Sequence, residues 1–222
     1  MLACGSYMTS VIRIPLRPTA DQATRLAALQ QAFAAVCNQL APLVQRTRCW
    51  NRVALHHMAY KQLRQQFPDL GSQLVCNAIY SVSRACRLIF QHPHSPFNLQ
   101  RLGPAPLPNL QFLPQSPVYF DRHTLSIKSG QVSMYTLDGR MRFQLDLSED
   151  HELRFKTEKL REIALRSRAT SYELVFHFAE ASDNPTDPPD LDGELPEYVL
   201  VQTHELLPPS GRPDADAIGL ST

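Results

Sequence analysis

The chain has 222 residues, of which 43% are hydrophobic and 19% charged, a composition typical of a globular protein with a sizeable core. It contains no run of 18 apolar residues, and its first residues lack the basic and apolar segments of a secretory signal, so we expect a cytoplasmic protein. The five cysteines are odd in number and include no C-x-x-C pair, which argues against a disulfide framework.

The net charge of +1 conceals a gradient along the chain. Residues 1–102 contain eleven Lys or Arg and two acidic residues, whereas residues 180–222 contain one Arg and ten acidic residues. This asymmetry favours a polyanionic partner for the basic end. The acidic end could cover the same basic surface when no partner is bound.

The first elements are predicted to be a strand and an amphipathic helix. Alternating apolar residues indicate a strand over 11–16. Thr19 and Gln22 have the spacing of a capping box, and the apolar residues from Leu26 to Leu43 recur at intervals of three and four. Pro42 is expected to kink or end this helix.

Two further helices are predicted by the same helical spacing of apolar residues. The second covers about 52–67, and the third begins after Gly71. Three amphipathic helices in succession predict a small helical bundle.

The periodicity changes to two after a proline-rich stretch. Short segments of alternating apolar and polar residues occupy 118–147 and predict antiparallel strands. Ser129-Gly130 and Asp138-Gly139 lie between them, and Asp-Gly is a strong hairpin signal.

The last third of the chain mixes strands with irregular segments. Residues 158–168 are interpreted as a short helix or an irregular crossover, and strands are predicted over 172–178 and 198–201. Residues 181–196 are rich in Asp, Glu and Pro and are expected to form a disordered loop that either regulates access to the basic surface or is merely solvated. The predicted fold class is α+β, an antiparallel oligonucleotide-binding-like β-barrel interrupted by a helical insert.

Basic residues of the helical part are the first candidates for nucleic-acid contacts. Phosphate binding requires Lys or Arg on a solvated face without interleaved carboxylates. The predicted helices offer such residues around their first connection and on the third helix: Arg46, Arg48, Arg52, Lys61, Arg64, Arg84 and Arg87. Trp50, which lies among them, could stack on a base or serve as a packing anchor.

The strands supply a second set of basic candidates. Lys128, Arg140 and Arg142 are expected on the polar face of the predicted hairpin, and Arg13 and Arg17 accompany the first strand. A barrel with basic outward residues is how oligonucleotide-binding barrels follow a backbone.

No catalytic, metal-binding or cofactor-binding residues are predicted. The histidines of His56-His57 and His92-Pro93-His94 lack metal-ligand spacing. The sequence also lacks a G-x-S-x-G motif, a phosphate-binding glycine loop and a dinucleotide fingerprint.

Three segments together resemble TnpB-type, transposon-encoded RNA-guided nucleases, a family related to type V CRISPR effectors. Residues 13–22 (RIPLRPTADQ) resemble the opening of that family, and residues 116–140 are similar to its later barrel strands. Residues 172–178 (YELVFHF) look like the strand that precedes its nuclease domain. The resemblance covers most of residues 11–205.

The resemblance implies a wedge domain interrupted by a helical recognition domain. The wedge barrel would comprise residues 1–18 and 105–207, and the recognition domain residues 19–104. Residues 208–222 would be a tail that resembles the start of a RuvC-like strand. Ser221 stands where the family has its first catalytic aspartate.

The function that the resemblance implies is binding of a structured guide-type RNA without cleavage. Target DNA, held as an RNA–DNA heteroduplex, and a separate RuvC-like nuclease subunit or a second copy of the chain are the further partners it suggests. Because two-metal cleavage needs several carboxylates, we expect no nuclease activity from this chain alone. The alternatives are a non-catalytic protein-assembly module and a decayed transposon fragment.

Overall fold

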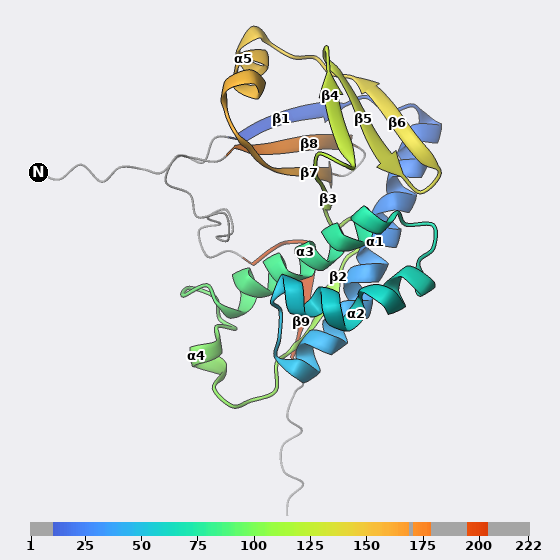
Figure 1. Ribbon diagram of the computed structural model, residues 1–222. Helices are drawn as coiled ribbons and strands as arrows, with labels where there is room; N and C mark the ends of the chain where they lie inside the picture. The colour runs from blue at the N-terminus through green and yellow to red at the C-terminus, as the bar shows by residue number, and fades with distance from the viewer. Residues whose placement is uncertain (1–10, 169–170, 179–194, 204–222) are drawn as a thin grey trace, which may run out of the picture.

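The computed structural model describes residues 11–168, 171–178 and 195–203. It combines helices with antiparallel sheets, which confirms the α+β class. Three helices and one short sheet lie at one end of the molecule, two larger sheets and a further helix lie at the other, and the first helix runs from the sheets to the helical end (Figure 1). The helices are α1 (Ala20–Thr47), α2 (Arg52–Gln66), α3 (Ser72–Phe90), α4 (Leu99–Leu102) and α5 (Glu149–Thr157).

The strands form three antiparallel sheets. The largest has the order β1-β8-β7-β3, the second is β4-β5-β6, and the third pairs β2 with β9. Their bounds are β1 (Val11–Leu16), β2 (Asn109–Phe112), β3 (Val118–Phe120), β4 (Leu125–Lys128), β5 (Gln131–Thr136), β6 (Gly139–Gln144), β7 (Leu160–Arg168), β8 (Ser171–Phe178) and β9 (Val199–Gln202).

Helix α1 begins where the capping box predicted. The Gln22 amide donates to Thr19 Oγ1, and the Thr19 amide donates to Gln22 Oε1. The helix does not end at Pro42 but continues to Thr47. Pro42 is exposed, while Ala41 and Val44 are buried in the core, so packing of the last turn offsets the hydrogen bond that proline cannot donate.

Residues 160–168 form strand β7, so the interpretation of 158–168 as a helix or crossover is wrong. Strand β7 pairs with β8 on one side and with β3 on the other. Its local sequence mixes apolar and charged residues with no period of two, and it is pairing on both edges that makes it a strand. Helix α5 and strand β2 were also not predicted.

The second sheet has a two-residue turn at Ser129-Gly130, as predicted, and another at Leu137-Asp138, one residue before the predicted Asp138-Gly139. Lys128 pairs with Gln131 across Ser129-Gly130, and both turn residues have positive φ, 49° and 72°. Thr136 pairs with Gly139, which has a φ of 107°. The positive φ of Ser129 and Gly130 fits the twist of a two-residue hairpin, whereas Gly139 is the first residue of β6.

The described strands form three separate sheets and no closed barrel, so the predicted oligonucleotide-binding-like barrel is not confirmed. Instead, β2 and β9 pair only with each other within the described part of the chain and lie along α1 (Figure 1). The Asn38 side chain on α1 accepts from the Phe112 amide at 2.7 Å and donates to the Phe112 carbonyl at 2.9 Å. The helix thus takes over hydrogen bonds of strand β2 that a neighbouring barrel strand would make.

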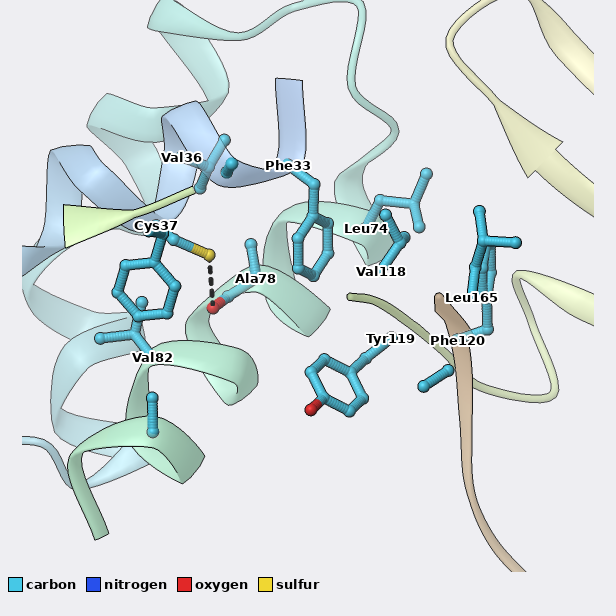
Figure 2. Close-up of a cluster of buried hydrophobic side chains, with 14 of the residues drawn as sticks. Phe33, Val36, Cys37, Leu74, Ala78, Val82, Val118, Tyr119, Phe120 and Leu165 are labelled. Carbon is cyan, nitrogen blue, oxygen red and sulfur yellow. Dashed lines mark hydrogen bonds between the residues drawn. The ribbon is translucent and has the colours of Figure 1, made fainter. Parts of the chain in front are cut away.

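One continuous cluster of buried side chains includes residues of both the helices and the sheets. At its centre Phe33 and Cys37 of α1 face Ala78 of α3, and Tyr119 of β3 lies beside them (Figure 2). The Cys37 thiol donates to the Ala78 carbonyl at 3.8 Å. The division into a helical and a barrel domain stays a prediction.

Candidate nucleic-acid interface

The outer face of the β4-β5-β6 sheet is a polar surface without carboxylates. Alternation along the strands buries one set of side chains and leaves the other set at the surface. Pairing aligns Ser133 with Arg142 and Tyr135 with Arg140. We call this surface the platform face; it consists of Ser126, Lys128, Gln131, Ser133, Tyr135, Arg140, Arg142 and Gln144.

An arginine–tyrosine stack lies on the platform face. Cζ of Arg140 lies 4.1 Å from the centroid of the Tyr135 ring, and Tyr135 is 43% exposed. The Arg140 guanidinium also donates to the Ser133 hydroxyl and carbonyl, both at 3.2 Å, and to the His123 carbonyl at 3.4 Å. Both planar groups are thereby held in place, and each can stack on a nucleic-acid base.

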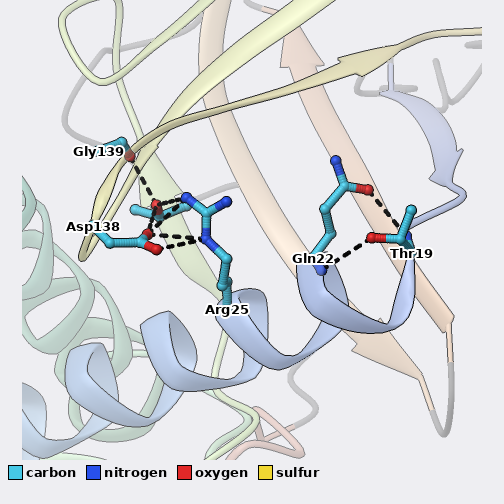
Figure 3. Close-up of polar contacts among 6 residues, drawn as sticks. Thr19, Gln22, Arg25, Asp138 and Gly139 are labelled. Carbon is cyan, nitrogen blue, oxygen red and sulfur yellow. Dashed lines mark hydrogen bonds and ion pairs between the residues drawn. The ribbon is translucent and has the colours of Figure 1, made fainter.

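The hairpin that carries this stack is attached to helix α1 (Figure 3). Arg25 Nη2 donates to an Asp138 carboxylate oxygen at 2.7 Å, and Arg25 Nε lies 2.7 Å from the other oxygen. The Thr136 hydroxyl donates to Asp138 Oδ1 and to the Gly139 carbonyl, both at 2.8 Å. The hydrogen bond from Arg25 lowers the pKa of Asp138. Asp138, which precedes the platform residue Arg140 by two positions, is therefore already paired, whereas Asp146, two positions after Gln144, is exposed.

A second basic feature continues from the platform face toward the start of α1. Arg17 and Arg142 both line a groove of about 550 Å³, which also contains Asp146. Gln22 lines the same groove and donates to the Arg142 carbonyl at 3.4 Å. Two of the predicted contacts, 125 residues apart in sequence, are brought together here.

The arginines around the first helix connection are exposed, but some are bound to the protein. Arg48 donates to the carbonyls of Ala105 and Gly103 at 2.8 and 3.1 Å. Cζ of Arg52 lies 5.5 Å from the Tyr80 ring centroid. Arg46 is exposed and has no hydrogen bond or ion pair to another described residue.

The predicted helical cluster is not a single cluster. Because α2 rises about 1.5 Å per residue, Lys61 and Arg64 lie roughly 14 and 18 Å along the helix from Arg52. Lys61 is exposed, whereas Arg64 is half-buried and donates to the carbonyls of Phe67 and Leu70. Arg64 therefore binds the segment that follows the C-terminal end of α2.

Arg84 was predicted on the polar side of the third helix, and this is wrong because its side chain is 1% exposed. Its Nε lies 3.2 Å from Glu162 Oε2 on β7, and its guanidinium lies over the Tyr119 ring. The Tyr80 hydroxyl donates to the same Glu162 oxygen at 2.7 Å. Arg84 thus stabilises a buried polar network, while Arg87 is half-buried.

The buried network extends to β8 and to the residue before β9. Arg84 Nη1 donates to the Tyr198 hydroxyl at 3.4 Å. His177 Nε2 lies 4.0 Å from Glu162 Oε1, and burial lowers the pKa of this histidine to about 4. Burial, and next the Glu162 carboxylate, raise the pKa of Tyr80. Burial thus keeps His177 neutral, against the opposing effect of Glu162, and keeps Tyr80 protonated at pH 7.

Two other candidates have structural partners. Trp50 is buried and packs against Phe90 with a centroid separation of 5.5 Å, as the packing interpretation predicted. Its ring is not available for stacking on a base. Arg13 Nη1 is paired with Glu173 Oε1 on the neighbouring strand at 3.1 Å.

The sequence analysis did not name Tyr135 and Gln22, which the structure adds to the candidate interface. The alternating pattern of the strand could have identified Tyr135. It lies two residues after Ser133, so both side chains are on the same face of β5, and buried Met134 is on the other face. Its position beside Arg140 follows from the register across the Leu137-Asp138 turn.

Residues 179–194 and 208–222, which contain most of the acidic segment and the RuvC-like tail, lie outside the described residues. Among the residues that the structure describes, no group of three or more His, Cys, Asp or Glu side chains could hold a metal ion. In the same residues, no helix is long and apolar enough to cross a membrane.

Comparison with known proteins adds no relative. No protein-family model matches this chain, and no curated protein sequence matches it.

Proposed function

We propose that this chain binds RNA and that the platform face is its main contact surface. In the terms of the TnpB resemblance, it is a nuclease-less protein that holds a structured guide-type RNA. The further proposed partners are target DNA paired to that RNA and a nuclease subunit acting in trans. An oligonucleotide-binding-like wedge barrel remains part of this proposal.

The observation that carries the proposal is the Arg140–Tyr135 stack on a sheet face that lacks carboxylates. Bases of single-stranded RNA stack on aromatic rings and guanidinium planes of exposed sheets. Lys128 of β4 and Arg142 of β6 add two exposed cations to the same face, on the two strands that flank β5, and both are available to phosphates of one bound strand. Arg17 extends the positive charge into the neighbouring groove.

The test measures RNA affinity of the purified chain across a salt titration. The RNA is the one that co-purifies with the tagged protein. We expect the double variant Lys128→Ala, Arg142→Ala to bind more weakly and to reduce the slope of log K against log salt by about 1.4, because two phosphate contacts are lost. Tyr135→Ala should reduce affinity by about 1–3 kcal/mol with little change in that slope.

The matched control removes two exposed cations elsewhere, through Arg101→Ala and Lys159→Ala. It should leave the affinity and its salt dependence close to those of the unmodified chain. Equal affinities for the platform variants and the unmodified chain would refute the platform face as the contact surface. If the chain binds no RNA and instead forms defined complexes with proteins, the assembly function is favoured.

A further inference from the structure

The groove beside β6 connects the platform face with the start of α1. Its volume is about 550 Å³. It is lined by Pro15, Arg17, Gln22 and residues 142–146. Arg142 and Gln144 belong both to this lining and to the platform face. A strand of RNA bound to the platform face can therefore continue into this groove, which we call the β6 groove.

Two guanidinium groups of the β6 groove are available to an anion. Arg17 follows β1 and Arg142 lies on β6; both are exposed, and neither side chain makes a hydrogen bond or ion pair to another described residue. The Gln22 side chain holds the two elements together, because it accepts from the Thr19 amide at 3.0 Å and donates to the Arg142 carbonyl at 3.4 Å. Guanidinium groups of this kind suit a phosphate.

One carboxylate lies in the same groove, and it is paired with neither arginine. Asp146 continues the alternation of buried and exposed side chains of β6, so its side chain lies on the same side of the chain as that of Arg142. It is exposed and makes no hydrogen bond or ion pair to another described residue. Asp146 is thus available to a ligand, although it shares the groove lining with Arg17 and Arg142.

A carboxylate in a phosphate-binding groove weakens the binding of phosphate unless the ligand also brings a hydrogen-bond donor, because an ionised carboxylate can only accept. In RNA, each ribose carries a 2′-hydroxyl on the carbon next to the one that bears the 3′ phosphate. A donor therefore lies beside every internal phosphate of RNA, whereas DNA has a hydrogen atom at this place. The 2′-hydroxyl is the group by which a protein distinguishes RNA from DNA at a given site.

We propose that the β6 groove selects RNA over DNA. Arg17 and Arg142 bind a phosphate of the backbone, and Asp146 accepts a hydrogen bond from the neighbouring 2′-hydroxyl. This inference rests on the proposed RNA-binding function and deepens it, because a stack such as Arg140–Tyr135 accepts the bases of RNA and DNA alike. Asp146 is the residue that determines the preference.

The experiment compares three single strands of about 15 nucleotides that differ only at the 2′ position: oligouridylate, its 2′-fluoro analogue and oligodeoxyuridylate. The 2′-fluoro strand keeps the sugar pucker of RNA but has no hydroxyl to donate, so it separates the hydrogen bond from the shape of the sugar. We expect the unmodified chain to bind oligouridylate about tenfold more tightly than either other strand, because only oligouridylate donates to the carboxylate.

Asp146→Ala removes the acceptor and should reduce this preference to less than about twofold. Because the variant also removes a negative charge, it should bind the 2′-fluoro and deoxy strands more tightly than the unmodified chain does. Asp21→Ala is the matched control, since Asp21 is an exposed acid in the first turn of α1 that does not line the groove. It should leave the preference for oligouridylate at about tenfold.

Equal binding of the three strands by the unmodified chain, a preference that survives Asp146→Ala, or equal losses of preference in the two variants would each overturn the inference. Absence of binding by all three strands would also overturn it, while the co-purified RNA decides the proposed function separately. Equal binding of the three strands that Tyr135→Ala weakens would refute the selection of RNA and leave the platform face standing. A preference that depends on Asp146, without any effect of Tyr135→Ala on affinity, would do the reverse.

Discussion

At residue 84 an arginine lies inside the protein rather than on its surface. In the sequence, Arg84 resembles Arg87, because both follow the helical spacing of a polar face. In the structure, Glu162 of β7 lies against Arg84, and the hydroxyls of Tyr80 and Tyr198 complete the network. A buried charge is tolerated where it is paired, and its partner is 78 residues away in the chain.

The Arg84–Glu162 pair yields a prediction about stability. Replacing Arg84 with Met leaves the Glu162 carboxylate buried without a cation, so the free energy of unfolding should fall by about 3–5 kcal/mol. The double variant Arg84→Met, Glu162→Gln should recover a large part of this loss, because no uncompensated charge remains. Urea unfolding of the unmodified chain and of these two variants measures both effects.

Arg101→Met serves as the control, since Arg101 is exposed and its replacement should change stability by less than about 0.5 kcal/mol. A double variant no more stable than Arg84→Met alone would show that the pair does not act as an ion pair.

At the level of elements, helix starts and tight turns were predicted well, and strand β7 was not. The capping box and the Ser129-Gly130 turn depend on contacts between residues at most three apart. Strand β7 depends on pairing with β3 and β8, which no local pattern records. Helix α5, which carries no buried residue, was missed because it shows no apolar stripe.

The capping box at the start of α1 gives a prediction at this scale. Thr19→Ala removes the oxygen that accepts from the Gln22 amide and should reduce the free energy of unfolding by about 1 kcal/mol. Thr24→Ala is the matched control, because Thr24 bonds only the Ala20 carbonyl within the described helix and alanine favours helix. Thermal and urea unfolding compare the two. Equal losses in both variants would contradict a specific role for the cap.

At the level of the whole molecule, helices and sheets share one buried cluster. We therefore expect a single cooperative unfolding transition rather than separate transitions of a helical and a sheet domain. Trp50 fluorescence reports on the helices, and the methyl signals of Met134 and Met141 report on the β4-β5-β6 sheet. The two denaturation midpoints should coincide.

Two separated midpoints would instead support the domain division that the resemblance implies. As a control, far-ultraviolet circular dichroism should follow the same curve as both local probes in the cooperative case.

The sequence by itself determined the features that depend on neighbours in the chain: the α+β class, the first three helices, both hairpin turns to within one residue and the exposure of Lys128, Arg140 and Arg142. Periodicity and turn chemistry act over a few residues, so they can be read without coordinates. Only the tertiary structure decided which distant residues meet. It buried Arg84 against Glu162, brought Arg17 beside Arg142 in one groove and attached the Asp138 turn to Arg25, because these contacts join residues far apart in the chain that meet only through packing of their elements.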